Sequence, residues 1–268
     1  MGQQKIKLVL CWHMHQPHYR DGLDGEYRLP WTYLHAIKDY SDMAAHLENH
    51  PQARVVVNFA PVLLEQLDDY SLQMREWLDS GQPMRDELLN CVAGAVAIPA
   101  DPQKRKKIVD ACQRCYAPTI IEPLPTFRFL HEIAQRFEHD QSAYMRMLAY
   151  LDEGFFRDLL MWYHLAWMGA RVRESEPRVQ MLMDKAHGFT AEDQRMLVEI
   201  MQEVVADIIP RYRALMERGQ IEISSTPYGH PIVPLLLDLR SMREAMPNAP
   251  APQYASYPRG LERARWHM

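Results

Sequence analysis

The sequence lacks the long apolar run that a membrane-spanning helix needs, because no uninterrupted apolar stretch approaches ~20 residues. It also lacks an excess of positive charge. Its 30 Lys and Arg stand against 35 Asp and Glu, which gives a formal charge of −5 with the 12 His neutral. This balance excludes a generally basic binder of nucleic acids or membrane surfaces. We therefore predict neither a nucleic acid nor a membrane among the partners.

Cysteine is scarce as well. Four cysteines in 268 residues cannot supply a disulfide framework, and their irregular placement is typical of a protein from a reducing compartment. The N-terminal Met-Gly-Gln-Gln-Lys leads into only a short apolar stretch, which gives no sign of a secretion signal. These features predict a cytoplasmic protein.

The composition that is present is ordinary for a globular protein, with 47% apolar and 24% charged residues. A chain of this length can bury the core of one large domain or of two small ones. Short runs rich in β-branched residues predict three buried strands. These strands are expected near residues 6–12, 54–59 and 220–225.

Residues 62–217, between the second and third strands, follow an almost entirely helical pattern. Thr190 and Asp193 resemble a capping box at the start of the last helix of this region, although Asp is shorter than the preferred Glu or Gln. Gly219 is a predicted C-cap for the same helix. Residues 247–258 are rich in proline and predict a loop.

The order of these elements predicts an α/β fold with a parallel sheet, because a helix joins the first two strands in a βαβ unit. In such folds the loops at the carboxyl ends of the strands lie on one face and build the active site. Three strands are too few to close an α/β barrel, and the amphipathic pattern from Leu261 to Met268 has no stop signal. The sequence therefore predicts the N-terminal part of a larger domain.

Histidines gather where the first and third strands are expected to end. His13 and His15 occupy alternate positions, which point to the same side of an extended segment, and His18 is close to them in sequence. His230 follows the third strand in a turn that contains Gly and Pro, and we expect it to face the same cleft. Imidazoles in this arrangement bind a metal ion or donate hydrogen bonds to a polar ligand.

Aromatic residues accompany these histidines in the sequence. Aromatic rings beside hydrogen-bonding side chains suit sugars, which have apolar C–H faces and hydroxyl-bearing edges, although each ring is as easily explained as part of the core. The residues concerned are Trp12, Tyr19, Tyr27, Trp31, Tyr33 and Tyr228.

Thiols and carboxylates give weaker signals. Cys112 and Cys115 have the spacing of a redox or zinc pair, but they lie in a helical pattern with no second pair, which favours buried thiols. A glycosidase needs two placed carboxyl groups. Of the acidic residues near strand ends, Glu222 lies inside the third strand and Glu65 near the start of a helix, and neither has an obvious partner.

Several long motifs, in the right order along nearly the whole chain, resemble glycoside hydrolase family 57. Residues 13–19 (His-Met-His-Gln-Pro-His-Tyr) resemble the first signature of that family, and residues 219–231 are similar to the second. Residues 29–40, 57–67 and 162–167 look like further stretches of its amylase- and glucanotransferase-like members.

The resemblance implies the N-terminal portion of an incomplete (β/α)7 barrel, with a large helical insertion between its second and third strands. It also implies retaining cleavage or transfer of α-glucan linkages, as in an α-amylase or a 4-α-glucanotransferase, with an α-glucan or maltooligosaccharide as substrate. No metal and no other cofactor is implied. His13, His15 and His230 correspond to residues that bind the substrate or support the transition state, and Gln16 and Trp31 are further candidates for substrate binding.

The same resemblance implies that the catalytic residues lie elsewhere. The nucleophile of the family is a Glu in its third signature and the acid/base is an Asp in its fourth, both expected beyond Met268. We therefore assign no catalytic residue within this chain. A downstream polypeptide that completes the barrel is the partner that this reasoning predicts.

Two alternatives stay open at this point. A His-x-His sequence at the end of a first barrel strand also begins the zinc site of amidohydrolases, in which His13 and His15 would bind the metal with ligands from later strands. The second alternative is a non-catalytic remnant that binds glucan.

Overall fold

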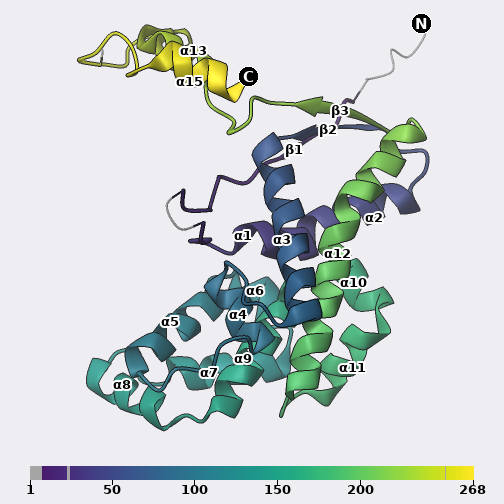
Figure 1. Ribbon diagram of the computed structural model, residues 1–268, viewed down its shortest axis with the longest axis vertical. Coiled ribbons are helices and arrows are strands. Elements are labelled where there is room, and N and C mark those ends of the chain that lie inside the picture. The colour runs from purple at the N-terminus through teal and green to yellow at the C-terminus, as the bar shows by residue number, and fades with distance from the viewer. Residues whose placement is uncertain (1–7, 23–24, 251) are drawn as a thin grey trace, which may run out of the picture. The chain divides into compact units, whose positions relative to one another are not determined.

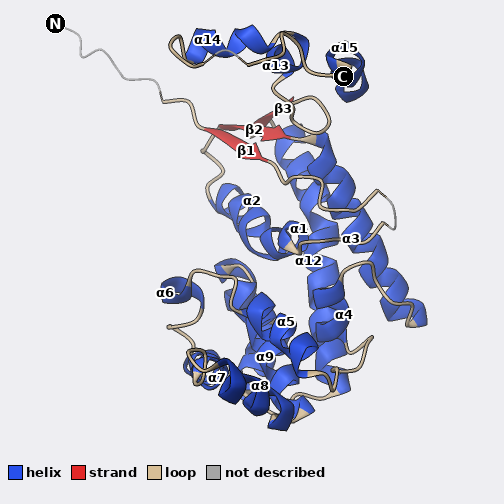
Figure 2. Ribbon diagram, turned by 90° about the vertical axis from the view of Figure 1, so that its left-hand side faces the viewer, coloured by secondary structure: helices blue, strands red, loops and turns tan. Residues whose placement is uncertain are grey.

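The computed structural model describes residues 8–22, 25–250 and 252–268. Helices make up most of these residues, and the strands are confined to one small sheet (Figure 1, Figure 2). The strands are β1 (Cys11–Met14), β2 (Val55–Phe59) and β3 (Ile221–Ser225). The helices are α1 (Trp31–His35), the π-helix η1 (Ala36–Tyr40), α2 (Ser41–Asn49), α3 (Pro61–Ser80), α4 (Glu87–Ala93), α5 (Pro102–Cys112), α6 (Ala117–Ile120), α7 (Pro125–Gln135), α8 (Gln141–Tyr150), α9 (Glu153–Trp167), α10 (Ala170–Ser175), α11 (Pro177–Lys185), α12 (Ala191–Glu217), α13 (Val233–Leu237), the 3-10 helix η2 (Leu239–Ser241), α14 (Met242–Ala245) and α15 (Gly260–His267).

The chain divides into two compact units, and two of the four boundaries between them fall inside the long helices α3 and α12. The first unit contains the sheet and consists of the residues up to 18, residues 52–66 and residues 215–268. The second unit consists of residues 19–51 and 67–214 and is mostly helical. Among the residues that the structure describes, no helix combines the length and apolarity needed to cross a bilayer.

The sheet of the first unit is parallel throughout, in the order β1-β2-β3, which confirms the predicted parallel arrangement. Alternate residues of β2 face opposite sides of the sheet. Val55, Val57 and Phe59 are buried, whereas Val56 and Asn58 on the other side are half-buried. One face of the sheet is therefore a core face, and the other remains accessible at its carboxyl end.

The first strand differs from its prediction, whereas β2 and β3 each begin one residue after the predicted strands. Residues 6 and 7 of the predicted strand lie outside the described residues, and Leu8 and Val9 are exposed and precede β1. Pairing explains these limits: Cys11 pairs with Val56, and β2 starts at Val55, so that Leu8 and Val9 have no residue of β2 opposite them. His13, expected after the strand, is therefore part of it.

The ends of α12 agree with the sequence analysis. The Thr190 backbone N–H donates to Asp193 Oδ2 (2.6 Å), and the Asp193 N–H donates to Thr190 Oγ1 (3.3 Å). This reciprocal pair confirms the capping box. Gly219 follows the helix with a φ of 68°, and the N–H of Gln220 reaches back to the Leu215 carbonyl oxygen (3.0 Å). Glycine is favoured here because a left-handed residue ends the helix.

After β3 the first unit continues with the short helices α13, η2 and α14, for which the sequence analysis had no prediction. Residues 247–250 and 252–258 form turns and bends, and α15 then packs against α13 (Figure 1). A Cβ atom at Gly260 would overlap the carbonyl oxygen of Leu236. Only glycine therefore allows the start of α15 to approach α13 this closely.

Helix α9 lies in the core of the second unit, since every residue from Leu159 to Trp167 is buried. Its first turn is capped by Asp152, whose carboxylate accepts a hydrogen bond from the N–H of Phe155 (2.9 Å). A helix that is apolar on all sides must be surrounded by protein. The burial confirms that Trp162, Tyr163 and their neighbours are core residues.

A hydrogen-bonded pair of polar side chains lies inside this core. His164 Nδ1 lies 2.8 Å from the Leu160 carbonyl oxygen, and His164 Nε2 lies 2.8 Å from the Tyr33 hydroxyl. Because a carbonyl can only accept, Nδ1 carries the proton and Nε2 accepts from the Tyr33 O–H. Burial lowers the pKa of His164 to about 4, so the ring is neutral at neutral pH.

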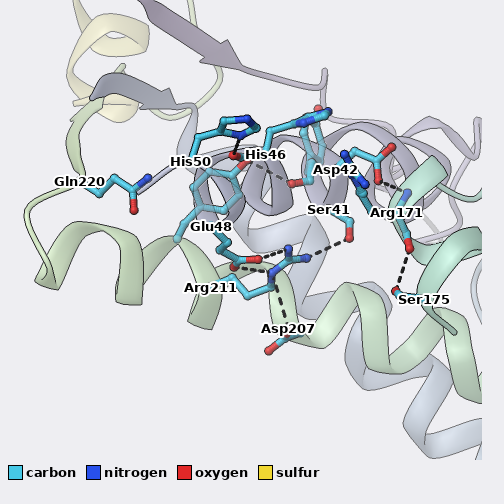
Figure 3. A network of polar contacts seen from close by, with 12 residues as sticks. Ser41, Asp42, His46, Glu48, His50, Arg171, Ser175, Asp207, Arg211 and Gln220 are labelled. Atoms are coloured by element: carbon cyan, nitrogen blue, oxygen red, sulfur yellow. Dashed lines mark hydrogen bonds and ion pairs between the residues drawn. The ribbon is translucent and has the colours of Figure 1, made fainter. Parts of the chain in front are cut away.

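A second polar network joins α12 to α2 within the same unit (Figure 3). The Arg211 guanidinium donates from Nε and Nη2 to the two carboxylate oxygens of Glu48, over 2.9 and 2.7 Å. Asp42 accepts hydrogen bonds from the N–H groups of Ala170 and Arg171 (2.7 and 3.1 Å) and so caps α10 from another helix. Bidentate pairing fixes the relative geometry of the two helices as well as adding stability.

Acidification should destabilise the protein through His164. The unfolded ring gains a proton near pH ~6.5, whereas the folded ring gains it only at about pH 4. Between these values the unfolded state binds more protons, so stability falls as the pH falls. His164 by itself should contribute a loss of up to about 1.4 kcal/mol per pH unit in that window, and Asp86, whose pKa burial raises to about 6, contributes with the opposite sign. Urea unfolding at pH 7, 6 and 5 measures the sum, and comparison with a variant that lacks the ring isolates the contribution of His164.

The matched control is the double variant His164→Leu, Tyr33→Phe, which removes the titrating ring and leaves no buried hydroxyl without a partner. Its free energy of unfolding should depend less steeply on pH over the same range. Identical slopes for the two proteins would contradict this account of His164.

Candidate functional site

Three histidines of the first unit lie ring against ring at the carboxyl ends of β1 and β3. The ring centroids of His13 and His230 are 4.5 Å apart, those of His15 and His230 4.9 Å, and those of His13 and His15 5.8 Å. His13 is in β1, His15 follows the end of that strand, and His230 lies in the loop after β3. Parallel pairing places these chain segments at one edge of the sheet.

The backbone of His230 has an uncommon conformation. Its φ is 53°, in the left-handed region that residues with a Cβ atom rarely adopt. The turn is closed by a hydrogen bond from the His230 N–H to the Pro227 carbonyl oxygen (2.8 Å). Such conformations persist where the surrounding structure imposes them, and they are frequent at functional sites.

His15 carries a buried ring nitrogen whose hydrogen-bonding capacity is unused. Its Nε2 is buried and has no hydrogen-bond partner among the described residues. Burial above all, and then the neighbouring rings of His230 and His13, lower the pKa of His15. The ring is therefore held neutral, and its buried nitrogen gains free energy from any ligand group that can hydrogen-bond to it.

A row of polar side chains crosses the sheet beside the histidines. His13 Nδ1 lies 2.7 Å from Asn58 Oδ1, and Asn58 Nδ2 donates to Ser224 Oγ over 2.9 Å. Neither Asn58 nor Ser224 was among the site residues predicted from the sequence. An Asn inside the apolar run of β2 was the signal that could have identified this position.

The loop after β3 is fixed by Tyr228. Its hydroxyl donates to the Glu65 carboxylate, its carbonyl accepts from the N–H of Val62 (3.2 Å), and its N–H donates to the His267 carbonyl oxygen (2.8 Å). Tyr228 and Trp266 lie edge to face, with centroids 5.2 Å apart, and help to line an open cleft of about 700 Å³. Glu65 thus has a structural partner, which the sequence did not indicate.

The other predicted binding and aromatic residues differ in unit and in burial. Gln16 is half-buried just beyond β1 in the first unit. Trp31 is the first residue of α1 in the second unit, where its ring centroid lies 5.9 Å from that of Trp167. Tyr27 and Tyr33 are buried, so for these two rings the interpretation as core residues is the correct one.

The geometry gives no support to a zinc site. No group of three or more His, Cys, Asp or Glu residues within the described ranges is arranged to hold a metal ion. The amidohydrolase alternative, which needs further ligands around His13 and His15, is therefore not supported. Cys112 is a buried free thiol and Cys115 a half-buried one. Burial raises the pKa of Cys115 to about 11, and that of Cys112 also rises, as expected for inert thiols.

The fold and the site define an α/β protein whose parallel strands carry an imidazole cluster suited to a polar ligand. A sequence model of glycosyl hydrolase family 57 matches residues 9–254. The chain belongs to this family, as its motifs predicted.

A crystal structure of a family 57 branching enzyme from the hyperthermophilic archaeon Thermococcus kodakaraensis, in complex with glucose, is similar to the chain at 14% sequence identity and a TM-score of 0.32. The similarity covers 97% of this chain and 31% of that enzyme, so the chain spans less than a third of its length. No curated protein matches the sequence.

Exchanges at position 230 should report on the left-handed backbone. His230→Gly should be more stable than His230→Ala by about 0.5–1 kcal/mol, because only glycine adopts this φ without a steric penalty. Urea unfolding of the two variants measures the difference. At His131, inside α7, the order should be reversed, since glycine weakens a helix. The same order at both positions would contradict the conformation assigned to His230.

Proposed function

We propose that this chain is the substrate-binding portion of a retaining enzyme that cleaves or transfers α-glucan linkages, as an α-amylase or a 4-α-glucanotransferase does. Membership of family 57 supports the class of enzyme. The observation that carries the binding role is the convergence of His13, His15 and His230 around a buried Nε2 that lacks a partner.

The protonation state of His15 favours sugars over charged ligands. A neutral imidazole has one donor and one acceptor, and a sugar hydroxyl can both donate and accept. An anion would instead favour protonated rings, which the lowered pKa of His15 opposes. A neutral, polyhydroxylated ligand such as an α-glucan or a maltooligosaccharide meets both conditions.

As part of the same proposal, residues 1–268 form the N-terminal part of an incomplete (β/α)7 barrel, and residues 62–217 are an insertion between its second and third strands. The parallel order β1-β2-β3 supports this assignment. Further support comes from the exposure of His13 and Glu222, which share one face of the sheet. That face corresponds to the interior of the barrel.

Gln16 of the first unit and Trp31 of the second are further substrate-binding residues in this proposal, each argued from its own surroundings. Gln16 follows directly on the histidine motif and carries an amide that can both donate and accept. Trp31 is half-buried and offers an apolar ring face beside Trp167, as sugar rings require. We propose that the activity needs no metal or other cofactor. We also propose a cytoplasmic location, because the few, irregularly placed cysteines are typical of a reducing compartment.

Catalysis needs two carboxyl groups, which we place outside residues 1–268 in the third and fourth signatures of the family. One observation within the first unit supports this placement: the Glu65 carboxylate accepts a hydrogen bond from the hydroxyl of Tyr228. A downstream polypeptide would then supply the nucleophile and the acid/base.

His15→Ala should weaken the binding of maltoheptaose by the full chain about tenfold, because the variant loses a buried hydrogen-bonding group. Isothermal titration calorimetry measures the affinity, and circular dichroism verifies the fold. His46→Ala is the matched control, since His46 is exposed on α2. Unchanged affinity in a folded His15→Ala protein would assign His15 a structural role.

The chain alone should not release reducing sugars from amylose, because binding residues without a paired acid and nucleophile cannot split a glycosidic bond at a useful rate. The assay uses monodisperse protein, with the variant Glu222→Gln for comparison. Robust release that Glu222→Gln abolishes would falsify the placement of the catalytic pair outside the chain.

A further inference from the structure

Asn58 lies at the centre of a row of three polar residues, one from each strand. The parallel register places His13 opposite Asn58, and Asn58 opposite Ser224. Their side chains lie on the same face of the sheet, because residues in register on neighbouring strands point the same way. Strands in a sheet are roughly 4.8 Å apart, a spacing that the amide of Asn58 bridges on both sides.

The directions of the two hydrogen bonds follow from the orientation of the amide, with Nδ2 toward Ser224 and Oδ1 toward His13. Asn58 Nδ2 lies 2.9 Å from Ser224 Oγ and donates to it, which turns Oδ1 toward His13. A carbonyl oxygen can only accept, so the nitrogen 2.7 Å away, His13 Nδ1, must carry a proton. A neutral imidazole has one N–H, and the lone pair therefore resides on Nε2.

We propose that Asn58 is a positioning residue, which holds His13 in the Nδ1–H tautomer and thereby makes its Nε2 an acceptor for a substrate hydroxyl. Ser224 acts one step further away, by accepting a hydrogen bond from Asn58 Nδ2 and so supporting the orientation in which Oδ1 faces His13. The consequence for substrate rests on the proposed function, whereas the tautomer itself does not.

The position of His13 within the cluster explains why its tautomer matters. Its ring lies 4.5 Å from that of His230 and 5.8 Å from that of His15, centroid to centroid. A ring free to rotate about its side-chain bonds would present a donor or an acceptor at random to the same ligand. The hydrogen bond to Asn58 removes this freedom before the ligand arrives, which lowers the entropic cost of binding.

The experiment is long-range proton–nitrogen NMR on the full chain labelled with ¹⁵N-histidine, recorded at pH 8.5 without ligand. The wild-type protein should show His13 with a protonated Nδ1 and an unprotonated Nε2. Asn58→Leu, which removes the acceptor, should shift both nitrogens toward averaged values. Asn58→Asp keeps an acceptor and should retain the Nδ1–H form.

Ser224→Ala tests the second step. It removes only the hydroxyl of a half-buried residue, so it tests the tautomer if Asn58→Leu does not fold. It should give a partial loss of the Nδ1–H form, because the amide of Asn58 is free to turn. Asn49→Ala is the matched control, since Asn49 is exposed at the end of α2. His13 should be unaffected in that variant.

Maltoheptaose affinity separates this inference from the proposed function. We expect Asn58→Leu to weaken binding about five- to tenfold and Asn58→Asp to restore much of it. An Nδ1–H tautomer that persists in folded Asn58→Leu overturns the positioning role, whatever the affinity. If Asn58→Leu does not fold, an unchanged tautomer in Ser224→Ala overturns it. A tautomer that changes while the affinity does not would support the role of Asn58 and contradict substrate binding through His13.

Discussion

The pairing of β2 with a parallel strand on each side is the constraint on which the candidate site depends. It aligns His13, Asn58 and Ser224 in one row and brings the carboxyl ends of β1 and β3 to one edge, roughly 10 Å apart. Histidine side chains from both ends span that distance and meet. A shift of β1 by one residue would turn His13 to the buried face of the sheet and place Met14 or Trp12 beside Asn58.

Buried histidine nitrogens have different roles in the two units, as His164 and His15 show. In the second unit, His164 is fully buried and both ring nitrogens have protein partners, the Leu160 carbonyl and the Tyr33 hydroxyl. In the first unit, His15 has a buried Nε2 without such a partner among the described residues. A satisfied buried ring contributes to the fold, whereas an unsatisfied one has hydrogen-bonding capacity left for a ligand. The presence or absence of hydrogen-bond partners, rather than burial, therefore distinguishes the structural residue His164 from the candidate binding residue His15.

Sequence patterns anticipated a good part of this structure. The parallel order of strands, the Thr190–Asp193 capping box, the buried character of α9 and the family of the protein all followed from composition, spacing and motifs. Two features could not be deduced in this way. The start of β1, which was predicted too early, depends on where β2 begins, and the choice between core and ligand-facing rings for Tyr27 and Tyr33, which the sequence left open, depends on what packs against them. Neither property is encoded in the residues next to them along the chain.

Helix caps, strand segments and the family motifs are properties of neighbouring residues, which is why they can be deduced from the amino-acid order. The partners of His13, the left-handed backbone of His230 and the contrast between His15 and His164 required the folded chain. Each arises from contacts between segments far apart in sequence. The strength of such a contact depends on the strand register, on burial and on the direction of each hydrogen bond. Packing determines all three, because it fixes the positions of the segments relative to one another.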